Sequence, residues 1–209
     1  MIVLGLTGSV GMGKSVAAGM FRRLGVPVHD SDAAVHRLLG PRGAAVEAVA
    51  KAFPGTRGPD GGIDRGTLGA RVFGDGAALR RLERVLHPLV RQSQAQFLKR
   101  ARAGRERLVV LDIPLLFETG GDKRCDAVVV VSAPAWLQRA RVMARPGMTD
   151  QRFRAILAKQ TPDAEKRRRA DVVVPSGLGR AVTFRRLARL VGALRRDDAA
   201  CAAESALPD

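Results

Sequence analysis

A glycine-rich segment near the start of the sequence has the residue types and the spacing that bind phosphate groups. Glycines at positions 8, 11 and 13 precede Lys14 and Ser15, and the segment matches the pattern G-x-x-x-x-G-K-[ST]. Glycine lets the backbone N–H groups of such a loop turn inward around phosphate oxygens. The lysine then reaches the β- and γ-phosphates, and the serine hydroxyl holds Mg²⁺. We therefore expect a nucleoside triphosphate to bind along Gly8, Ser9, Val10, Gly11, Met12, Gly13, Lys14 and Ser15.

Carboxylates follow two of the apolar runs that we expect to form strands. Asp30 and Asp32 come after the second run, and Asp112 ends the third. In a parallel α/β sheet, the carboxyl ends of the strands face the ligand crevice. There, Asp30 or Asp32 can orient or deprotonate an acceptor hydroxyl, although either one alone can also serve as the N-cap of a helix over 33–39. Asp112 can support Mg²⁺, directly or through a water molecule.

Two pairs of basic side chains are spaced four residues apart, so each pair lies on one face of a helix. Arg141 and Arg145 precede the break Pro146-Gly147, and they are either solvated positions or part of a mobile lid over the phosphates. On a lid, arginines stabilise charge on the transferring phosphoryl group and exclude water. His87 and Arg91 form the second pair, in which helix capping explains His87 as well as a ligand contact does.

The elements that must position these side chains follow from apolar periodicity and from glycine and proline breaks. We expect an α/β fold, a parallel sheet of the P-loop type flanked by helices. Apolar runs predict strands at 2–6, 25–29, 108–112, 127–131 and 171–174. Amphipathic runs predict helices at 16–24, at 33–39, at 44–53, from 135 onward, from 150 onward and at 180–194.

Residues 40–104 differ from the flanking sequence and predict a helical insertion. Leucines recur at helical spacing from 79 to 89, but Pro88 interrupts them. Because proline is tolerated in the first turn of a helix and poorly inside it, we expect one helix to end near Leu86. A second helix, capped by His87, would run from Pro88 to about Arg102. The expected organisation is a core over 1–39 and 105–196, a lid over about 139–160, the insertion over 40–104 and a flexible tail over 197–209.

The composition limits the class of protein. The net charge is +16, from 36 lysines and arginines against 20 acidic residues, which invites comparison with nucleic-acid-binding proteins. The sequence has no tyrosine, one tryptophan and no run of alternating aromatic and basic residues, so we attribute the charge mainly to solvated helix faces and a polyanionic small substrate. No stretch reaches the roughly 20 apolar residues of a membrane span, and we expect a cytoplasmic protein. Cys125 and Cys201 show neither disulfide-framework nor zinc-site spacing.

Taken in order, these motifs resemble those of the dephospho-coenzyme A kinases from Ile2 to about Leu194. The P-loop alone occurs in many families, whereas the full set is specific. Its marks are Gly8 to Ser15, Gly25-Val-Pro-Val-His-Asp-Ser-Asp32, Asp64-Arg65 with Leu68 and Phe73, His87-Pro88 followed by Arg91, Pro114-Leu-Leu-Phe-Glu118, Arg141 with Met143-Ala-Arg145, Gln160, and Arg169-Ala-Asp171.

The resemblance implies transfer of the γ-phosphate of ATP, with Mg²⁺, to the 3′-hydroxyl of dephospho-CoA, the last step of coenzyme A synthesis. It implies that Asp32 is the catalytic base and that Lys14, Arg141 and Arg145 bind the phosphates in transfer. Ser15 and Asp112 are the expected Mg²⁺ ligands. We expect a monomer with no nucleic-acid or membrane partner, whose acceptor contacts are Asp32, Arg65, His87, Arg91 and Leu115.

Two positions depart from that family, and two other kinds of nucleotide-binding protein fit less well. Pro146 stands where many members have an acidic residue, so the lid can hinge differently, and Pro175-Ser176 stands where many have Asp-Asn, which leaves an adenine contact from that turn open. GTPases would carry N-K-x-D and D-x-x-G motifs, which we do not find. Shikimate kinases would carry Gly-Gly-Gly after the third strand, where this sequence has Asp112-Ile-Pro.

Overall fold

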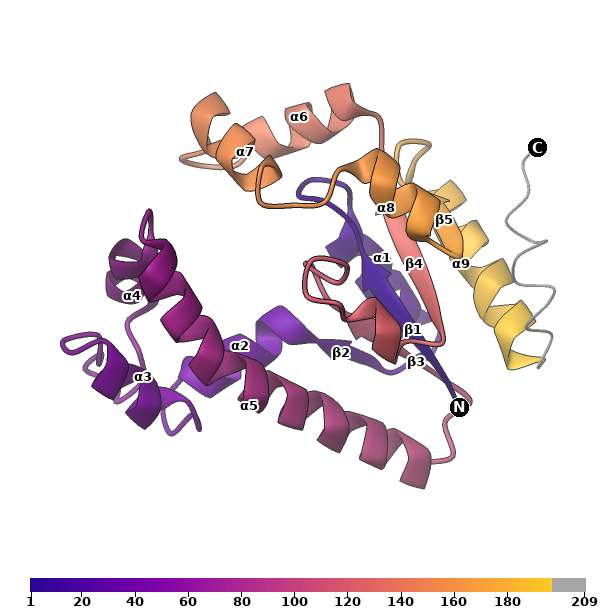
Figure 1. Cartoon of the computed structure of the whole chain (residues 1–209). Helices are drawn as coiled ribbons and strands as arrows, with labels where there is room; N and C mark the ends of the chain where they lie inside the picture. The colour runs from indigo at the N-terminus through magenta and orange to yellow at the C-terminus, as the bar shows by residue number, and fades with distance from the viewer. Residues whose placement is uncertain (197–209) are drawn as a thin grey trace. The chain divides into compact units, whose positions relative to one another are not determined.

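The computed structural model describes residues 1–196, and the tail expected over 197–209 lies outside them. Within the described residues, five strands form one sheet in the order β2-β3-β1-β4-β5, with parallel pairing of β1 to β3, β1 to β4 and β4 to β5 (Figure 1). The strands are β1 (Ile2–Thr7), β2 (Val28–Asp30), β3 (Leu108–Asp112), β4 (Ala127–Ser132) and β5 (Val172–Pro175). These elements confirm the strands predicted from the apolar runs, although β2 begins at Val28 rather than at 25, since valine- and leucine-rich segments fit a sheet buried on both faces.

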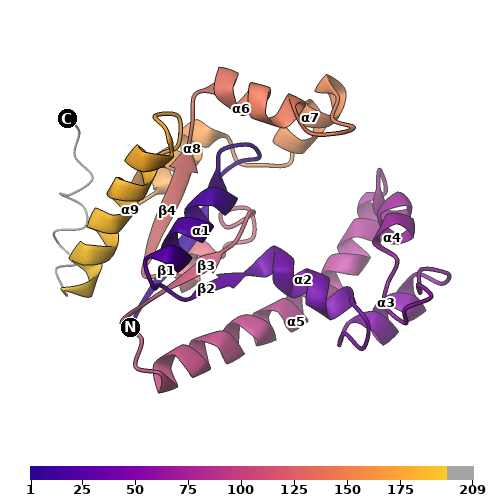
Figure 2. The same cartoon turned by 180° about the vertical axis from the view of Figure 1, so that it is seen from behind.

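The chain divides into two compact units, and the first contains Met1–His29 and the residues from Ala101 onward. Its helices are α1 (Lys14–Arg23), α6 (Ala135–Met143), α7 (Asp150–Leu157), α8 (Asp163–Arg169) and α9 (Arg180–Arg195), with a short 3-10 helix, η1 (Asp122–Arg124). Helices α1 and α9 contact each other, and they lie side by side in both views (Figures 1 and 2).

The core of the first unit is built on alternate residues of the strands. Leu4 and Leu6 of β1 join the cluster that includes Phe21 of α1 and Leu187 of α9. The opposite face of β1 carries Gly5, which is covered closely: a Cβ there would lie 2.9 Å from Leu116 Cδ2 and 2.9 Å from Cys125 Sγ. The glycine loop after β1 therefore starts from a strand that is fixed on both faces.

The second unit, Asp30–Arg100, has its own apolar core. It contains α2 (Ser31–Leu39), α3 (Val46–Ala52), α4 (Arg65–Val72) and most of α5 (Gly76–Ala103). The helix predicted over 44–53 is thus confirmed by α3. The core side chains come from all four helices and the 53–63 segment, and they include Leu39, Val46, Val49, Phe53, Ile63, Leu68, Leu82 and Leu86.

The predicted helix break at residues 86–88 is wrong. Helix α5 runs without interruption from Gly76 to Ala103 with Pro88 inside it, so His87 caps no helix. An interior proline costs about 3 kcal/mol because it removes one hydrogen bond and crowds the carbonyl of residue i−4. Packing on both sides of the proline offsets this cost: Leu86 is buried before it, Leu89 packs against the same core after it, and full burial of such a side chain stabilises by about 1.5–3 kcal/mol. Pro88 is itself exposed, so water can solvate the backbone groups that it leaves without partners.

Across residues 1–196, no helix combines the length and the apolar composition needed to span a membrane.

Candidate active site

The glycine loop joins β1 to α1, as the motif requires. Gly11 and Gly13 have φ angles of 77° and 92°, which lie in the left-handed region that only glycine adopts freely. Gly8 is needed for a different reason: a Cβ at this position would lie 2.6 Å from the carbonyl oxygen of Val131 on β4. The sequence therefore uses glycine for conformation at two positions and for close packing at the third.

Lys14 and Asp112 meet where β3 ends. Lys14 Nζ lies 2.6 Å from Asp112 Oδ1, and the carboxylate side chain is only 2% exposed. Parallel pairing puts Leu6 beside Asp112, so the end of β3 lies next to the start of the glycine loop. The lysine and the carboxylate, both selected from sequence, are thus brought together in a buried ion pair.

Arg141 of α6 binds the glycine loop and the turn after β5. Its Nη1 donates to Ser176 Oγ (3.0 Å) and to the carbonyl of Gly11 (3.4 Å), and its Nη2 donates to the carbonyl of Ser176 (2.8 Å). Arg145 follows the last residue of α6 by two positions and is exposed. The structure therefore attaches one of the two predicted lid arginines to the loop and leaves the other at the surface.

Two glutamines hold the backbone of Val10 from both sides. Gln138 Nε2 donates to the Val10 carbonyl (2.8 Å), and the Val10 N–H donates to Gln160 Oε1 (3.1 Å). Gln138 lies on α6, and Gln160 lies between α7 and α8. The segment from Gln138 to Gln160, which includes most of α6 and all of α7, therefore contacts the glycine loop through the residue at each of its two ends.

A buried ion pair supports the second of these contacts. Lys166 Nζ lies 2.9 Å from Glu118 Oε1, and the lysine side chain is completely buried. Glu118 Oε1 also accepts from the N–H of Thr161, the residue after Gln160 (2.7 Å). Burial works to raise the pKa of Glu118, but its contact with Lys166 and the backbone N–H groups of Glu118 and Thr161 outweigh burial and lower that pKa. Glu118 is therefore ionised, and through Thr161 and Lys166 it holds the segment that contains Gln160 in place.

The remaining site residues in the first unit are Ser15 and Leu115. Ser15 is exposed in the first turn of α1, directly after Lys14. Leu115 lies in the loop after β3 and is also exposed, at 37%. Among the residues that the structure describes, no group of three or more His, Cys, Asp or Glu side chains could hold a metal ion.

The predicted acceptor residues other than Leu115 belong to the second unit. Asp30 is the N-cap of α2, since its Oδ1 accepts from the N–H of Ala33 (2.9 Å). This assigns the capping role to Asp30, and Asp32 lies exposed in the first turn of the same helix. Arg65 begins α4, whose cap is Asp64.

His87 and Arg91 lie one turn apart on α5, and both are exposed. They therefore share a face of the helix, as their spacing predicts, although inside one continuous helix rather than at a helix start.

Sequence reasoning missed three groups at this site. In the sequence Ser176 stands out only as a departure from a family pattern, and Gln138 and Lys166 are not among the candidate residues. Lysine 166 carries no local signal, because a K-R-R-R run is typical of a solvated face. Glu118, which ends the motif Pro114-Leu-Leu-Phe-Glu118, gives a partial indication that a lysine or arginine is buried nearby, since a buried carboxylate needs a cationic partner.

A parallel sheet, a glycine loop between β1 and α1, and a lysine held at the end of β3 define the class of the protein, a P-loop kinase. The dephospho-CoA kinase family model matches residues 2–178, and the chain therefore belongs to the dephospho-CoA kinase family.

Relatives carry the name of this family, and two solved structures share the fold. A dephospho-CoA kinase of Paramagnetospirillum magneticum is 67% identical over 80% of this chain and 78% of its own length. One from Rhodospirillum rubrum is 60% identical over 89% of this chain and 88% of its own. The crystal structure of TT1252 from Thermus thermophilus, 38% identical, superposes with a TM-score of 0.79 over 92% of this chain and 96% of that one. A Campylobacter jejuni dephospho-CoA kinase, 22% identical, shares the fold with a TM-score of 0.66 over 92% of this chain and 96% of its own.

Proposed function

We propose that this chain transfers the γ-phosphate of ATP to the 3′-hydroxyl of dephospho-CoA, giving coenzyme A and ADP. Membership of the dephospho-CoA kinase family supports both the reaction and the acceptor. The observation that carries the proposal is the glycine loop itself, with Lys14 held 2.6 Å from a buried carboxylate and Arg141 bonded to the same loop. Such a loop binds phosphate through backbone N–H groups, and its cations act on the phosphoryl group in transfer.

The phosphates of ATP would lie along Gly8 to Ser15. Lys14 reaches the β- and γ-phosphate oxygens, and its contact with Asp112 keeps the ammonium group directed toward the end of the sheet. Arg141 and Arg145 bind the phosphates from α6 and from the residues that follow it. Because Lys14 and Arg141 are already held in place, they stabilise the transition state without reorganising during the reaction.

Mg²⁺ fits the oxygen atoms that this loop offers. The ion prefers oxygen ligands and is usually held by one or two protein groups together with substrate phosphates. The exposed hydroxyl of Ser15 and the carboxylate of Asp112, directly or through water, are the protein groups that would hold it. Bound there, Mg²⁺ would neutralise charge on the β- and γ-phosphates.

Asp32 is the proposed base that orients and deprotonates the acceptor hydroxyl. Its neighbour Asp30 is the carboxylate that caps α2, so the carboxylate of Asp32 is not needed to begin that helix. It is exposed, as a group that must contact a substrate hydroxyl has to be.

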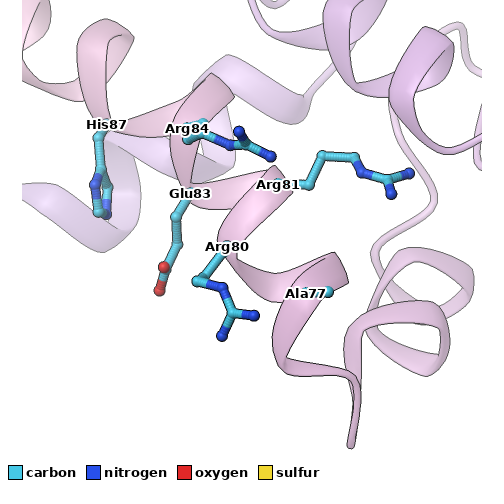
Figure 3. Close-up of a pocket in the computed structure, with 6 residues that line it drawn as sticks. All are labelled: Ala77, Arg80, Arg81, Glu83, Arg84 and His87. Carbon is cyan, nitrogen blue, oxygen red and sulfur yellow. The ribbon is translucent and has the colours of Figure 1, made fainter.

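The second unit would bind the rest of the acceptor through Asp32, Arg65, His87, Arg91 and, from the first unit, Leu115. Of these residues, His87 lines an open pocket of about 480 Å³ on α5 (Figure 3). In this view Arg80, Glu83 and His87 point to one side of the helix, and Arg81 and Arg84 point to another. The guanidinium of Arg81 lies over the ring of Phe53, whereas Arg84 forms no ion pair within the described residues. Three arginines against one glutamate give this pocket a net positive charge, which complements the pyrophosphate that joins the two halves of dephospho-CoA.

The pair α6 and α7 would act as a lid. The two helices contact each other, and they are joined through Pro146 and Gly147, of which Gly147 has a φ of 70°. Gly147 lets the chain turn between the two helices, and closure of the lid would exclude water from the phosphoryl group.

The test is release of ADP from Mg-ATP, measured with dephospho-CoA, shikimate, nucleosides, nucleoside monophosphates and single-stranded DNA as acceptors. We expect rapid turnover with dephospho-CoA alone and coenzyme A as the product. Turnover that depends on another acceptor, or on DNA, would overturn the proposal.

A further inference from the structure

The hydroxyl of Ser176 connects three parts of the nucleotide site that come from distant parts of the sequence. Ser176 follows β5, Met12 belongs to the glycine loop, and Arg141 lies on α6. The distance from Ser176 Oγ is 2.6 Å to the Met12 carbonyl oxygen and 3.0 Å to Arg141 Nη1. A Cβ on Gly13 would lie 3.1 Å from the same oxygen, so the turn and the loop are in direct contact.

The chemistry of the partners fixes the direction of these bonds. A carbonyl can only accept, so the single hydroxyl proton of Ser176 is donated to Met12. A guanidinium can only donate, so the lone pairs of the same oxygen accept from Arg141. An alanine at this position could do neither.

The backbone of the same residue completes the contact. The carbonyl of Ser176 accepts from Arg141 Nη2 at 2.8 Å, so both terminal nitrogens of the guanidinium are bound by one residue. With the longer contact to the Gly11 carbonyl at 3.4 Å, Arg141 uses three of its five N–H groups. Within residues 1–196 the remaining N–H groups form no hydrogen bond, so they can bind phosphate oxygens, and the planar fork holds them in a fixed direction.

The bond to Met12 affects the loop as well. Because a trans peptide is planar, its carbonyl and the N–H of the next residue point in opposite directions. Directing the Met12 carbonyl toward Ser176 therefore directs the N–H of Gly13 away from this turn, as phosphate binding by a nest of N–H groups requires.

We propose that Ser176 is a positioning residue, whose hydroxyl holds the guanidinium of Arg141 in the orientation that binds the transferring phosphoryl group. This inference rests on the proposed role of Arg141 in phosphate binding. It gives the turn Pro175-Ser176 a function in phosphoryl transfer rather than in binding adenine.

A double-mutant cycle on turnover with saturating Mg-ATP and dephospho-CoA tests this proposal. We expect Arg141→Ala to lower kcat by about 10²-fold or more, as for loss of a group that stabilises transition-state charge. Ser176→Ala should lower kcat by about tenfold while the Kd for ATP changes by less than about threefold, because its effect appears mainly in the transition state. In the Arg141→Ala background, Ser176→Ala should change kcat by less than about twofold.

Thr183→Ala is the matched control for a purely structural effect. Thr183 Oγ1 lies 3.0 Å from the Pro175 carbonyl oxygen and 3.1 Å from that of Gly179 and shares its one proton between them, so it stabilises the same turn, and no hydrogen bond in residues 1–196 joins it to the loop or to Arg141. We expect it to lower Tm and to leave kcat within about twofold, since only turn stability is lost. If Ser176→Ala does not fold, Ser176→Cys, which keeps the shape and weakens both bonds, takes its place in the cycle.

The outcomes separate this proposal from the one on which it depends. If Arg141→Ala keeps full turnover, the role of Arg141 fails and this inference fails with it. If Arg141→Ala is impaired but the two substitutions multiply, or if Thr183→Ala lowers kcat as much as Ser176→Ala, Ser176 does not act through Arg141 and the inference alone is overturned.

Discussion

The buried ion pair between Glu118 and Lys166 gives the prediction with the largest expected effect on stability. Replacing Glu118 by Gln keeps the shape of the side chain and an oxygen that can accept from the N–H of Thr161. It removes the negative charge that lies 2.9 Å from Lys166 Nζ. Since the lysine side chain is completely buried, its charge is left without compensation.

The expected magnitude follows from the burial of both partners. Breaking a buried pair by removing one partner costs about 3–5 kcal/mol, whereas an exposed pair contributes about 0–1 kcal/mol. Glu118 keeps 15% of its side chain exposed, which screens part of the interaction and favours the lower end of the range. We therefore expect Glu118→Gln to lower the free energy of unfolding by about 3 kcal/mol.

Glu165→Gln on the same α8 helix is the matched control. Glu165 pairs with Arg169 at 3.6 Å, and both side chains are well exposed, so its loss should cost at most about 0.5 kcal/mol. Urea denaturation followed by circular dichroism measures both variants. Equal losses of stability in the two variants would refute the claim that burial makes the Glu118–Lys166 pair important.

The pH dependence of the same pair has a definite sign. Because the pKa of Glu118 is lowered in the folded state, the pair contributes its full stability above the pKa of the unfolded glutamate, about 4.3. That contribution is lost as the pH falls from there through the folded pKa. The difference in stability between the wild type and Glu118→Gln should therefore be constant near neutral pH and shrink below about pH 4.3.

Lys14→Ala should abolish phosphoryl transfer to dephospho-CoA while its circular dichroism spectrum remains that of a folded protein. Near-normal activity of this variant would contradict phosphate binding by the glycine loop. Asp32→Asn should lower kcat by about 10²-fold or more, with the Kd for ATP changed only a few fold. Asp30→Asn, whose asparagine can still cap α2, should leave kcat within about threefold of the wild type. Equal kcat values for the two variants would show that Asp32 is not the base. Burial raises the pKa of Cys125 to about 11, so alkylation by iodoacetamide, followed by mass spectrometry in a Cys201→Ser background, should be slow at pH 7–8 and accelerate toward that value. Rapid alkylation at pH 7 would show that Cys125 is not shielded.

The sequence predicts the strands and the glycine loop well because their signals are local. The run from Leu108 to Leu111 is apolar at every position and is followed by Asp112, which fits a central parallel strand. The loop needs glycine at Gly11 and Gly13 for their positive φ, and the spacing of the motif reflects that need directly.

The break predicted at Pro88 fails because a local rule was outweighed by packing over a longer distance. Proline disfavours the interior of a helix, but side chains on both sides of Pro88 pack into one core: Leu86 is buried before it, and Leu89 packs against the same cluster after it. The spacing of the leucines already indicated one continuous stripe. Burial along that stripe, rather than the proline, sets the bounds of the helix.

The ambiguity between Asp30 and Asp32 also shows where sequence reasoning ends. Both can cap a helix, and only the hydrogen bond from Ala33 identifies Asp30 as the cap. The contacts of Ser176 and Gln160 with the loop depend on the order of the strands in the sheet, because they join residues 164 and 150 positions apart. Neither periodicity nor a motif can predict a contact between residues so far apart in the sequence.

The central claim is the transfer of the γ-phosphate to one particular hydroxyl. The most direct measurement is ³¹P nuclear magnetic resonance of the products formed from equimolar Mg-ATP and dephospho-CoA. The account predicts a new phosphomonoester signal coupled to the 3′ proton of the ribose, together with ADP. A signal from a 2′-phosphate, or ADP with inorganic phosphate and unchanged dephospho-CoA, would contradict it.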